Sequence, residues 1–260
     1  MLASKDNPTP SSRRKKGRRM GGKGLLLASV AGFFALNFVV QIVRKPTEIL
    51  RFAGLGRGRS PGGTWSEFGA DCLRYEGGAI TAEYLAALIQ VESSGDRFAA
   101  PPWRWRWSLD PWRVYAPPSS AVGVLQITKG NLGAARSMVG RDDDSDGCAI
   151  MGQCIRLIGS DSIAMTSAFL QSRVRASLAG QGRQASVRDK QVLAAVIHLC
   201  GPNKGPALVR ANFDPDSLGT CGGQSVGSYV RLVMKYREQF SRLALVDKNQ
   251  AARARGSGMG

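Results

Sequence analysis

The chain has 260 residues, which limits it to one good-sized domain with appendages or to two small domains. A hydrophobic content of 43% and a charged fraction of 21% are ordinary for a globular protein. The formal net charge of +17 suits any polyanion and excludes neither nucleic acid, nor anionic lipid, nor an acidic wall polymer.

The N-terminal part of the chain reads as a basic tail followed by an apolar helix. Residues 1–23 are polar, basic and rich in Ser, Pro and Gly, which predicts a disordered cytoplasmic tail. Residues 24–43 contain no charged residue, and about 20 apolar residues in a helix cross a bilayer core of roughly 30 Å. The basic run ahead of this segment predicts a single pass through the cytoplasmic (inner) membrane, with the N-terminus inside and the remaining chain outside the cytoplasm.

Two other interpretations of this apolar segment remain open. A cleaved signal peptide has a shorter apolar region and a small-residue cleavage site, whereas QIVRKP follows the segment here. A buried core helix fits the composition but not the basic run that precedes it. The sequence therefore favours an uncleaved anchor.

The remainder of the chain predicts a mainly α domain. We expect a linker over residues 44–64, a folded domain over 65–246 and a flexible tail over 247–260. Apolar residues recur at helical spacing, and no stretch alternates convincingly with period two. This spacing predicts helices that begin after Thr81 and Asp161 and further helices over about 186–199 and 226–245.

The five cysteines fit an oxidising compartment. Cys148 and Cys154 are close in sequence, and Cys200 and Cys221 bracket a loop rich in Gly and Pro. We expect two local disulfides from these pairs, with Cys72 left over, although spacing alone does not fix the connectivity. Five buried free thiols in a cytosolic protein are the alternative.

Several sequence blocks carry a family resemblance. They are VESSGD at 91–96, SSAVGVLQIT at 119–128, DSIAMTSAFL at 161–170, AAVIHLCGPNKG at 194–205 and YVRLVMKY at 229–236. In this order they resemble the catalytic domain of soluble lytic transglycosylases, a lysozyme-like family. Its pattern has Glu-Ser at a helix end, then G-A-x-G-L-M-Q-I, S-I-x-x-G-A-x-x-L, A-A-Y-N-A-G-P and Y-V-x-x-V. The resemblance implies a lysozyme-like helical domain.

The resemblance also implies a reaction and its acid. Glu92 would protonate the β-1,4 glycosidic oxygen between N-acetylmuramic acid and N-acetylglucosamine, then accept a proton from the muramic carbon-6 hydroxyl to leave a 1,6-anhydro end. Ser93, Ser120, Gly123 and Gln126 would orient the sugar. No cofactor is required, and the expected partner is the peptidoglycan glycan strand, with the membrane reached through one helix.

The position of Glu92 allows two interpretations. It shares the apolar stripe of its helix with Leu85, Leu88 and Ile89, which predicts partial desolvation and a raised pKa suited to an acid near neutral pH. Alternatively, an exposed Glu92 at the helix end would pair with Arg97.

The chain departs from the family pattern at two places. His198 and Leu199 replace the usual Tyr-Asn, so His198 is either a substrate contact or a hydrogen-bonded core histidine. Ser225 and Val226 replace the Glu-Thr that precedes the last helix. Tyr229, at the start of the closing block, is expected to contact substrate.

Residues 99–118 form an insertion that holds four of the five tryptophans. Because aromatic faces stack on sugar rings, we expect Trp103 and Trp105 to line the glycan cleft. Interleaved arginines also fit a membrane-contact loop. The alternation of Trp103, Trp105 and Trp107 equally fits a half-buried strand that covers the domain.

One short acidic motif resembles the start of a calcium loop. Asp142, Asp144 and Asp146 precede Gly147, but position twelve is Gln153 rather than a bidentate Glu. A solvated acidic turn is therefore the favoured interpretation, and calcium the alternative.

Other functions compete with the transglycosylase. A muramidase of the same fold would hydrolyse the bond with Asp96 as second carboxylate, and a non-catalytic wall-binding or assembly module would hold glycan only. A nucleic-acid-binding membrane protein explains the charge, but the sequence contains no nucleic-acid-binding motif. We therefore do not expect nucleic acid as a partner. An envelope-spanning machinery is left open as a further partner.

Overall fold

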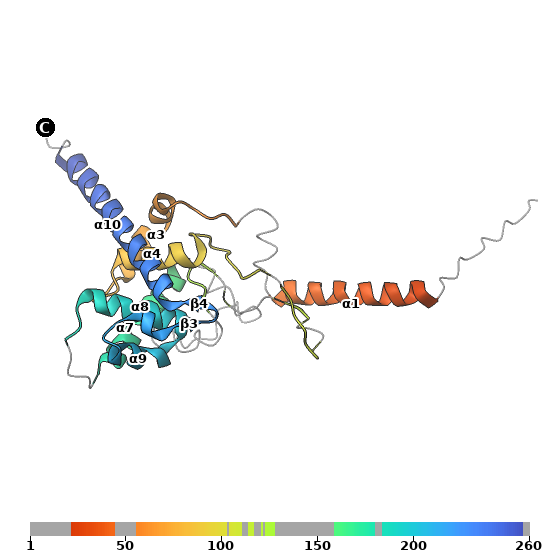
Figure 1. The fold of residues 1–260 in the computed structure, drawn as a ribbon. Helices are drawn as coiled ribbons and strands as arrows, with labels where there is room; N and C mark the ends of the chain where they lie inside the picture. The colour runs from red at the N-terminus through yellow and green to blue at the C-terminus, as the bar shows by residue number, and fades with distance from the viewer. Residues whose placement is uncertain are drawn as a thin grey trace, which may run out of the picture.

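The computed structural model describes residues 22–44, 56–102, 104–110, 114–116, 121, 123–127, 159–179 and 184–256. Most of them are helical, which confirms the mainly α prediction (Figure 1). The α-helices are α1 (Gly22–Arg44), α3 (Pro61–Tyr75), α4 (Ala82–Ser93), α7 (Gly159–Leu178), α8 (Val187–Cys200), α9 (Gly205–Arg210) and α10 (Val226–Gly256). The short elements are the 3-10 helices η2 (Pro202–Lys204) and η3 (Pro215–Leu218) and the antiparallel pairs β1 (Arg104–Trp105) with β2 (Tyr115–Ala116) and β3 (Thr220–Cys221) with β4 (Gln224–Ser225).

Helix α1 projects from the helical body (Figure 1). By length and composition it is able to cross a membrane, and a signal sequence would pass the same test. Only 6% of its apolar window, Gly22–Val40, is buried. Because a core helix buries most of its surface, this exposure argues against the buried-core interpretation of the segment.

Helix α4 lies at the centre of the core. Thr81 caps its N-terminus by accepting a hydrogen bond from the Tyr84 backbone N–H, as expected for a helix that begins after Thr81. Leu85, Leu88 and Ile89 are completely buried among side chains of α3, α7, α8 and α10. The helix ends at Ser94, which takes a left-handed conformation with φ of 52°. Burial of residues 84–90 fixes where the last turn of the helix lies.

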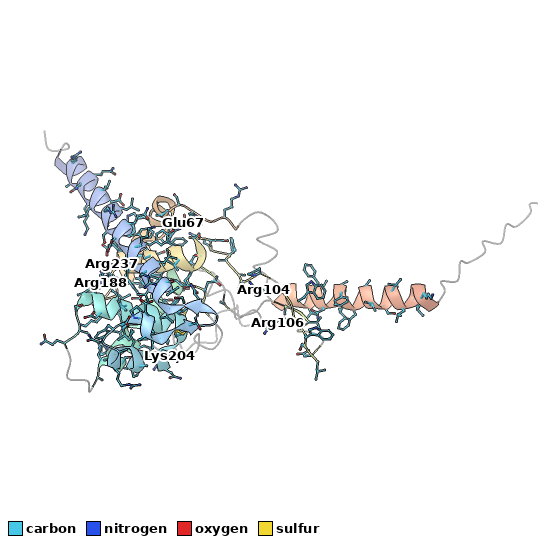
Figure 2. The ribbon with its side chains drawn as sticks, viewed as in Figure 1. Glu67, Arg104, Arg106, Arg188, Lys204 and Arg237 are labelled. Carbon is cyan, nitrogen blue, oxygen red and sulfur yellow. A yellow bond between two sulfur atoms is a disulfide. The ribbon has the colours of Figure 1, made fainter. Side chains whose placement is uncertain are left out.

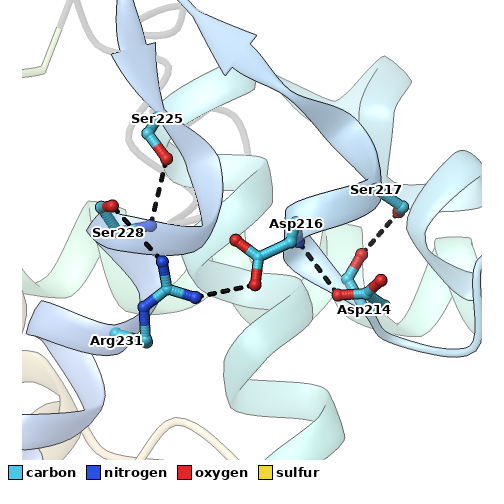
Figure 3. Close-up of polar contacts among 6 residues, drawn as sticks. All are labelled: Asp214, Asp216, Ser217, Ser225, Ser228 and Arg231. Atoms are coloured by element: carbon cyan, nitrogen blue, oxygen red, sulfur yellow. Dashed lines mark hydrogen bonds and ion pairs between the residues drawn. The ribbon is translucent and has the colours of Figure 1, made fainter.

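Helices α8 and α10 begin at hydrogen-bonded serines. Ser186 and Asp189 form a reciprocal capping box at α8, which starts where the sequence predicts. At α10, Ser225 Oγ accepts from the Ser228 N–H, and an ion pair of 2.7 Å joins Arg231 to Asp216 of η3 (Figure 3). Ser225 therefore has a capping role in the position where the family carries a Glu.

The folded region is longer than expected at both ends. Helix α3 begins at Pro61 rather than near residue 65, because Ser60 caps it and the Arg59 N–H donates to the Ser94 carbonyl at 2.6 Å. Helix α10 continues through the expected tail to Gly256. Trp65 Nε1 donates to Asp247 at 2.6 Å, which ties this part of α10 to α3. Helices α3 and α10 thus extend beyond the positions 65 and 246 at which the folded domain was expected to begin and end.

One expected disulfide is present in the described residues. Cys200 at the end of α8 is bonded to Cys221 on β3, and Cys72 is free and buried, both as predicted. Burial and the nearby carboxylates of Asp71, Glu83 and Glu76 raise the pKa of the Cys72 thiol, which makes it a packing group rather than a nucleophile. Cys148 and Cys154 lie outside the described residues.

Candidate active site

A cleft of about 590 Å³ opens beside the end of α4. Helices α4, α7 and α8 and the turn between β3 and β4 form one wall, and two loop segments, 99–102 and 121–127, supply the other. The side chains that matter most for chemistry are Glu92, Gln126, Thr166, His198 and Gln224.

Glu92 occupies the last turn of α4 and has two polar neighbours. The Tyr229 hydroxyl of α10 donates to Glu92 Oε1, and His198 Nε2 of α8 lies 3.3 Å from the same oxygen. The Glu92 side chain is 18% exposed, and that of His198 13%. Both contacts fall on Oε1, so within the described part of the chain Oε2 is the oxygen left for a ligand.

The environment of Glu92 lowers its pKa, contrary to the expected rise. Burial raises the pKa, but the positive charge of His198, its hydrogen bond and that of Tyr229 together outweigh the burial. The alternative partner, Arg97, instead bonds to Glu67 of α3. The prediction of a desolvated Glu92 is therefore correct, and the predicted direction of its pKa is wrong for the empty cleft.

Two buried tyrosines accompany Glu92. Burial, and next the negative charge of Glu92, raise the pKa of Tyr229 and of Tyr84 well above the ordinary value. Both hydroxyls therefore keep their proton at neutral pH. The Tyr84 hydroxyl has no hydrogen-bond partner among the described residues.

The loop wall is organised around the Ala99 carbonyl. It accepts from the Gly123 N–H at 2.9 Å and from Gln126 Nε2 at 2.8 Å, and Nε2 also donates to the Gly123 carbonyl at 2.9 Å. Gly123 has φ of 82°, a conformation that favours glycine. Because the Gln126 amide nitrogen is used on the backbone, its Oε1 is left to accept from a ligand.

Other expected site residues lie elsewhere. Ser93 Oγ donates to the Ile89 carbonyl within its own helix, and Ser93 is not among the residues that line the cleft. Trp105 is 65% exposed and packs its ring against Phe34 of α1, with centroids 5.2 Å apart. Figure 2 shows its neighbours Arg104 and Arg106 beside α1. Trp103, Ser120, Asp142, Asp144 and Asp146 lie outside the described residues.

Several cleft residues, among them Thr166, Phe169 and Gln224, were not predicted from the sequence as site residues. Thr166 is 4% exposed, lines the cleft, and its Oγ1 has no hydrogen-bond partner in the described residues. It stands where the family block S-I-x-x-G-A-x-x-L has Gly, and that mismatch is the signal that would have found it. Phe169 lines the cleft from the same helix.

Asp96 does not supply a second carboxylate to the cleft. Its side chain is buried, Oδ1 accepts from the Phe98 N–H at 2.8 Å, and the residue does not line the cleft. Glu92 is thus the only acidic residue among the described residues that line it. In the same part of the chain no three His, Cys, Asp or Glu side chains are grouped as a metal site.

No protein-family model matches the chain, and no curated protein is significantly similar to it.

Proposed function

We propose that this protein is a peptidoglycan lytic transglycosylase with Glu92 as its acid. The observation that carries the proposal is a largely buried carboxylate, the only one among the described residues that line an open cleft, with both of its contacts in that part of the chain on Oε1. The ordered sequence blocks around Glu92, Gly123, His198 and Tyr229 support it independently.

The reaction needs one carboxylate. Glu92 donates a proton to the oxygen between N-acetylmuramic acid and N-acetylglucosamine, and that bond breaks. The substrate's acetamido group shields the resulting cation, which makes this a substrate-assisted exception to the two-carboxylate scheme. Glu92 then accepts the proton of the carbon-6 hydroxyl as that oxygen closes the 1,6-anhydro ring, so no water is consumed.

The neighbours of Glu92 fit these steps. Tyr229 holds Oε1, so Oε2 is the oxygen that meets the glycan. Gln126 Oε1 and Thr166 Oγ1, on opposite walls, are the hydrogen-bonding groups that a bound sugar would satisfy. A glycan that fills the cleft also removes water from Glu92, and desolvation favours the protonated form that the first step requires.

The location proposed with this activity is the cytoplasmic membrane. Helix α1 serves as a single-pass anchor, and the basic N-terminal tail stays inside. The catalytic domain then faces the wall on the periplasmic or extracytoplasmic side, where a disulfide persists.

The test is digestion of purified peptidoglycan by the full chain in detergent micelles, with released muropeptides identified by mass spectrometry. We expect 1,6-anhydro ends from the wild type and a loss of about 10²–10⁴-fold in rate from Glu92→Gln, the range of a general acid. Asp96→Asn, whose carboxylate lies outside the cleft, is the matched control and should produce the same ends as the wild type.

The products also distinguish the alternatives. Reducing ends, lost in Asp96→Asn, would make the protein a muramidase. No release, with the protein still sedimenting with the wall, would leave a glycan-binding module and refute the proposed reaction.

A further inference from the structure

His198 lies in the cleft beside Glu92. It is the only histidine in the sequence, it lines the cleft, and its Nε2 lies 3.3 Å from the carboxylate proposed to be the acid. It is largely buried, so solvent screens its interaction with Glu92 only weakly.

The groups around Glu92 differ in the charge they can carry. Tyr84 from α4 and Tyr229 from α10 are neutral, because both keep their proton. Thr166 and Gln126, which complete the two walls, do not titrate. Among the described residues that line the cleft there is no Lys or Arg. His198 is therefore the one lining group there that can place a positive charge beside Glu92.

We propose that His198 is a positioning residue that keeps Glu92 ionised in the empty cleft and thereby restrains cleavage wherever the imidazole carries its proton. This inference rests on the proposed function, in which Glu92 must carry a proton to start the reaction.

The restraint follows from the balance between the ionised and the protonated form of Glu92. Protonating Glu92 beside a cationic imidazole gives up an ion pair and a charge-assisted hydrogen bond, so the acid form is less populated. A neutral residue at position 198 removes that cost, while burial and the Tyr229 hydroxyl remain. In the wild type the protonated form of Glu92 becomes more populated when the pH falls. It also becomes more populated when bound glycan excludes water from Glu92 and His198.

The first arm of the test measures the pair without any substrate. Because the chain has a single histidine, its imidazole gives one set of NMR signals in the full chain in micelles. Because the carboxylate and the imidazole act on each other equally, Glu92→Gln should change the pH at which the imidazole signals move. Ser93→Ala is the control, since Ser93 Oγ donates to the Ile89 carbonyl of its own helix, and its imidazole signals should follow those of the wild type.

The second arm measures the pH dependence of cleavage. In His198→Gln we expect kcat/KM for anhydro products to rise at the pH values at which the wild-type imidazole carries its proton, so that the pH profile changes shape. Above its pKa, Glu92 carries about ten times more proton for each pH unit by which that pKa rises. His198→Asn, with a shorter neutral side chain, should behave in the same direction, and thermal melting verifies that each variant is folded.

Two results would overturn the inference. One is an imidazole that titrates identically in the wild type and Glu92→Gln. The other is a folded His198→Gln whose kcat/KM falls with its pH profile unmoved, as a merely structural role predicts. A wild type that releases no anhydro product refutes the proposed function instead, and the NMR arm then still decides whether His198 and Glu92 form an ion pair.

Discussion

The two walls of the cleft are built on different principles. The helical wall carries both titratable groups, Glu92 and His198, on helices whose inner faces are fully buried. In the loop wall, the described lining residues of segments 99–102 and 121–127 include no titratable side chain. The titratable groups therefore lie on the helical wall, while the loop wall gives shape and hydrogen-bonding groups.

The walls also differ in what holds them. The helical wall is fixed by core packing and by the disulfide that fastens β3 to the end of α8, two residues after His198. The loop wall is fixed by hydrogen bonds that converge on the Ala99 carbonyl. The disulfide and the hydrogen bonds to the Ala99 carbonyl can each be removed by mutation without changing the other.

The largest effect should come from removing the disulfide. Cys200→Ser combined with Cys221→Ser frees a loop with a sequence separation of 21, and a native disulfide of this kind contributes about 3 kcal/mol to stability. We expect a fall of that size in the free energy of unfolding, measured by urea titration of the full chain in micelles. Because Cys221 and Gly222 line the cleft, cleavage should fall as well.

Wild type treated with a reductant is the matched comparison for the disulfide variant. If the double variant unfolds at the same urea concentration as the oxidised wild type, the helical wall does not depend on this bond.

A smaller effect is expected on the loop wall from Gln126→Ala. The change removes two hydrogen bonds from Nε2, each worth about 1 kcal/mol net, and deletes the Oε1 acceptor. We expect about 2 kcal/mol less stability and about tenfold slower cleavage, since one hydrogen bond to the sugar is worth roughly 1.4 kcal/mol. Urea unfolding and muropeptide release measure the two quantities.

Gln126→Gly separates backbone from side chain in this experiment. Gln126 has φ of 49°, which glycine adopts without the cost of about 1 kcal/mol or more that a side chain brings. The Gly variant should therefore be more stable than the Ala variant and equally slow. An Ala variant that cleaves as fast as the wild type would remove Gln126 from the glycan site.

The sequence predicted the helical wall better than the loop wall. Helical spacing and capping residues located α4 and α8, since Thr81 and Ser186 act through local hydrogen bonds that short segments specify. The Cys200–Cys221 bond was the pairing expected for two cysteines that bracket a Gly/Pro-rich loop. These features depend on neighbours in the chain, which a single sequence displays.

Features that depend on long-range packing were missed. The lowered pKa of Glu92 arises from His198 and Tyr229, which are far away in sequence, so the apolar stripe of α4 alone gave the wrong direction. Likewise, the hydrogen bond from Trp65 to Asp247 joins distant segments, and composition alone placed the tail boundary too early. Trp105 was assigned to the cleft because aromatic side chains stack on sugar rings. That argument contains no information on where Trp105 lies in the fold.

The pH dependence of stability tests the electrostatics of the helical wall. The folded-state pKa of Glu92 lies below its ordinary value of 4.5, so its ionised form stabilises the fold above pH 4.5. This contribution is lost as the pH falls through the folded-state pKa. The free energy of unfolding of the wild type should therefore decrease relative to Glu92→Gln between pH 5 and pH 3.

His198→Gln provides the control for this measurement. Without the imidazolium the main cause of the lowered pKa is gone, so most of the difference between pH 5 and pH 3 should vanish. A difference that persists undiminished in that background would mean that Tyr229, rather than His198, holds the carboxylate ionised.

The smallest effect is expected from Trp105→Ala. Trp105 lies in the sequence between the two segments that form the loop wall. The side chain is 65% exposed and contacts Phe34 of α1, and Trp105 does not line the cleft. Removing it should leave the rate of cleavage of soluble glycan fragments by the full chain within about twofold, since its ring gives no sugar-stacking energy. A tenfold slower rate, with the melting temperature unchanged, would return Trp105 to the glycan site. It would also show that the loop wall supplies binding energy to the sugar as well as shape.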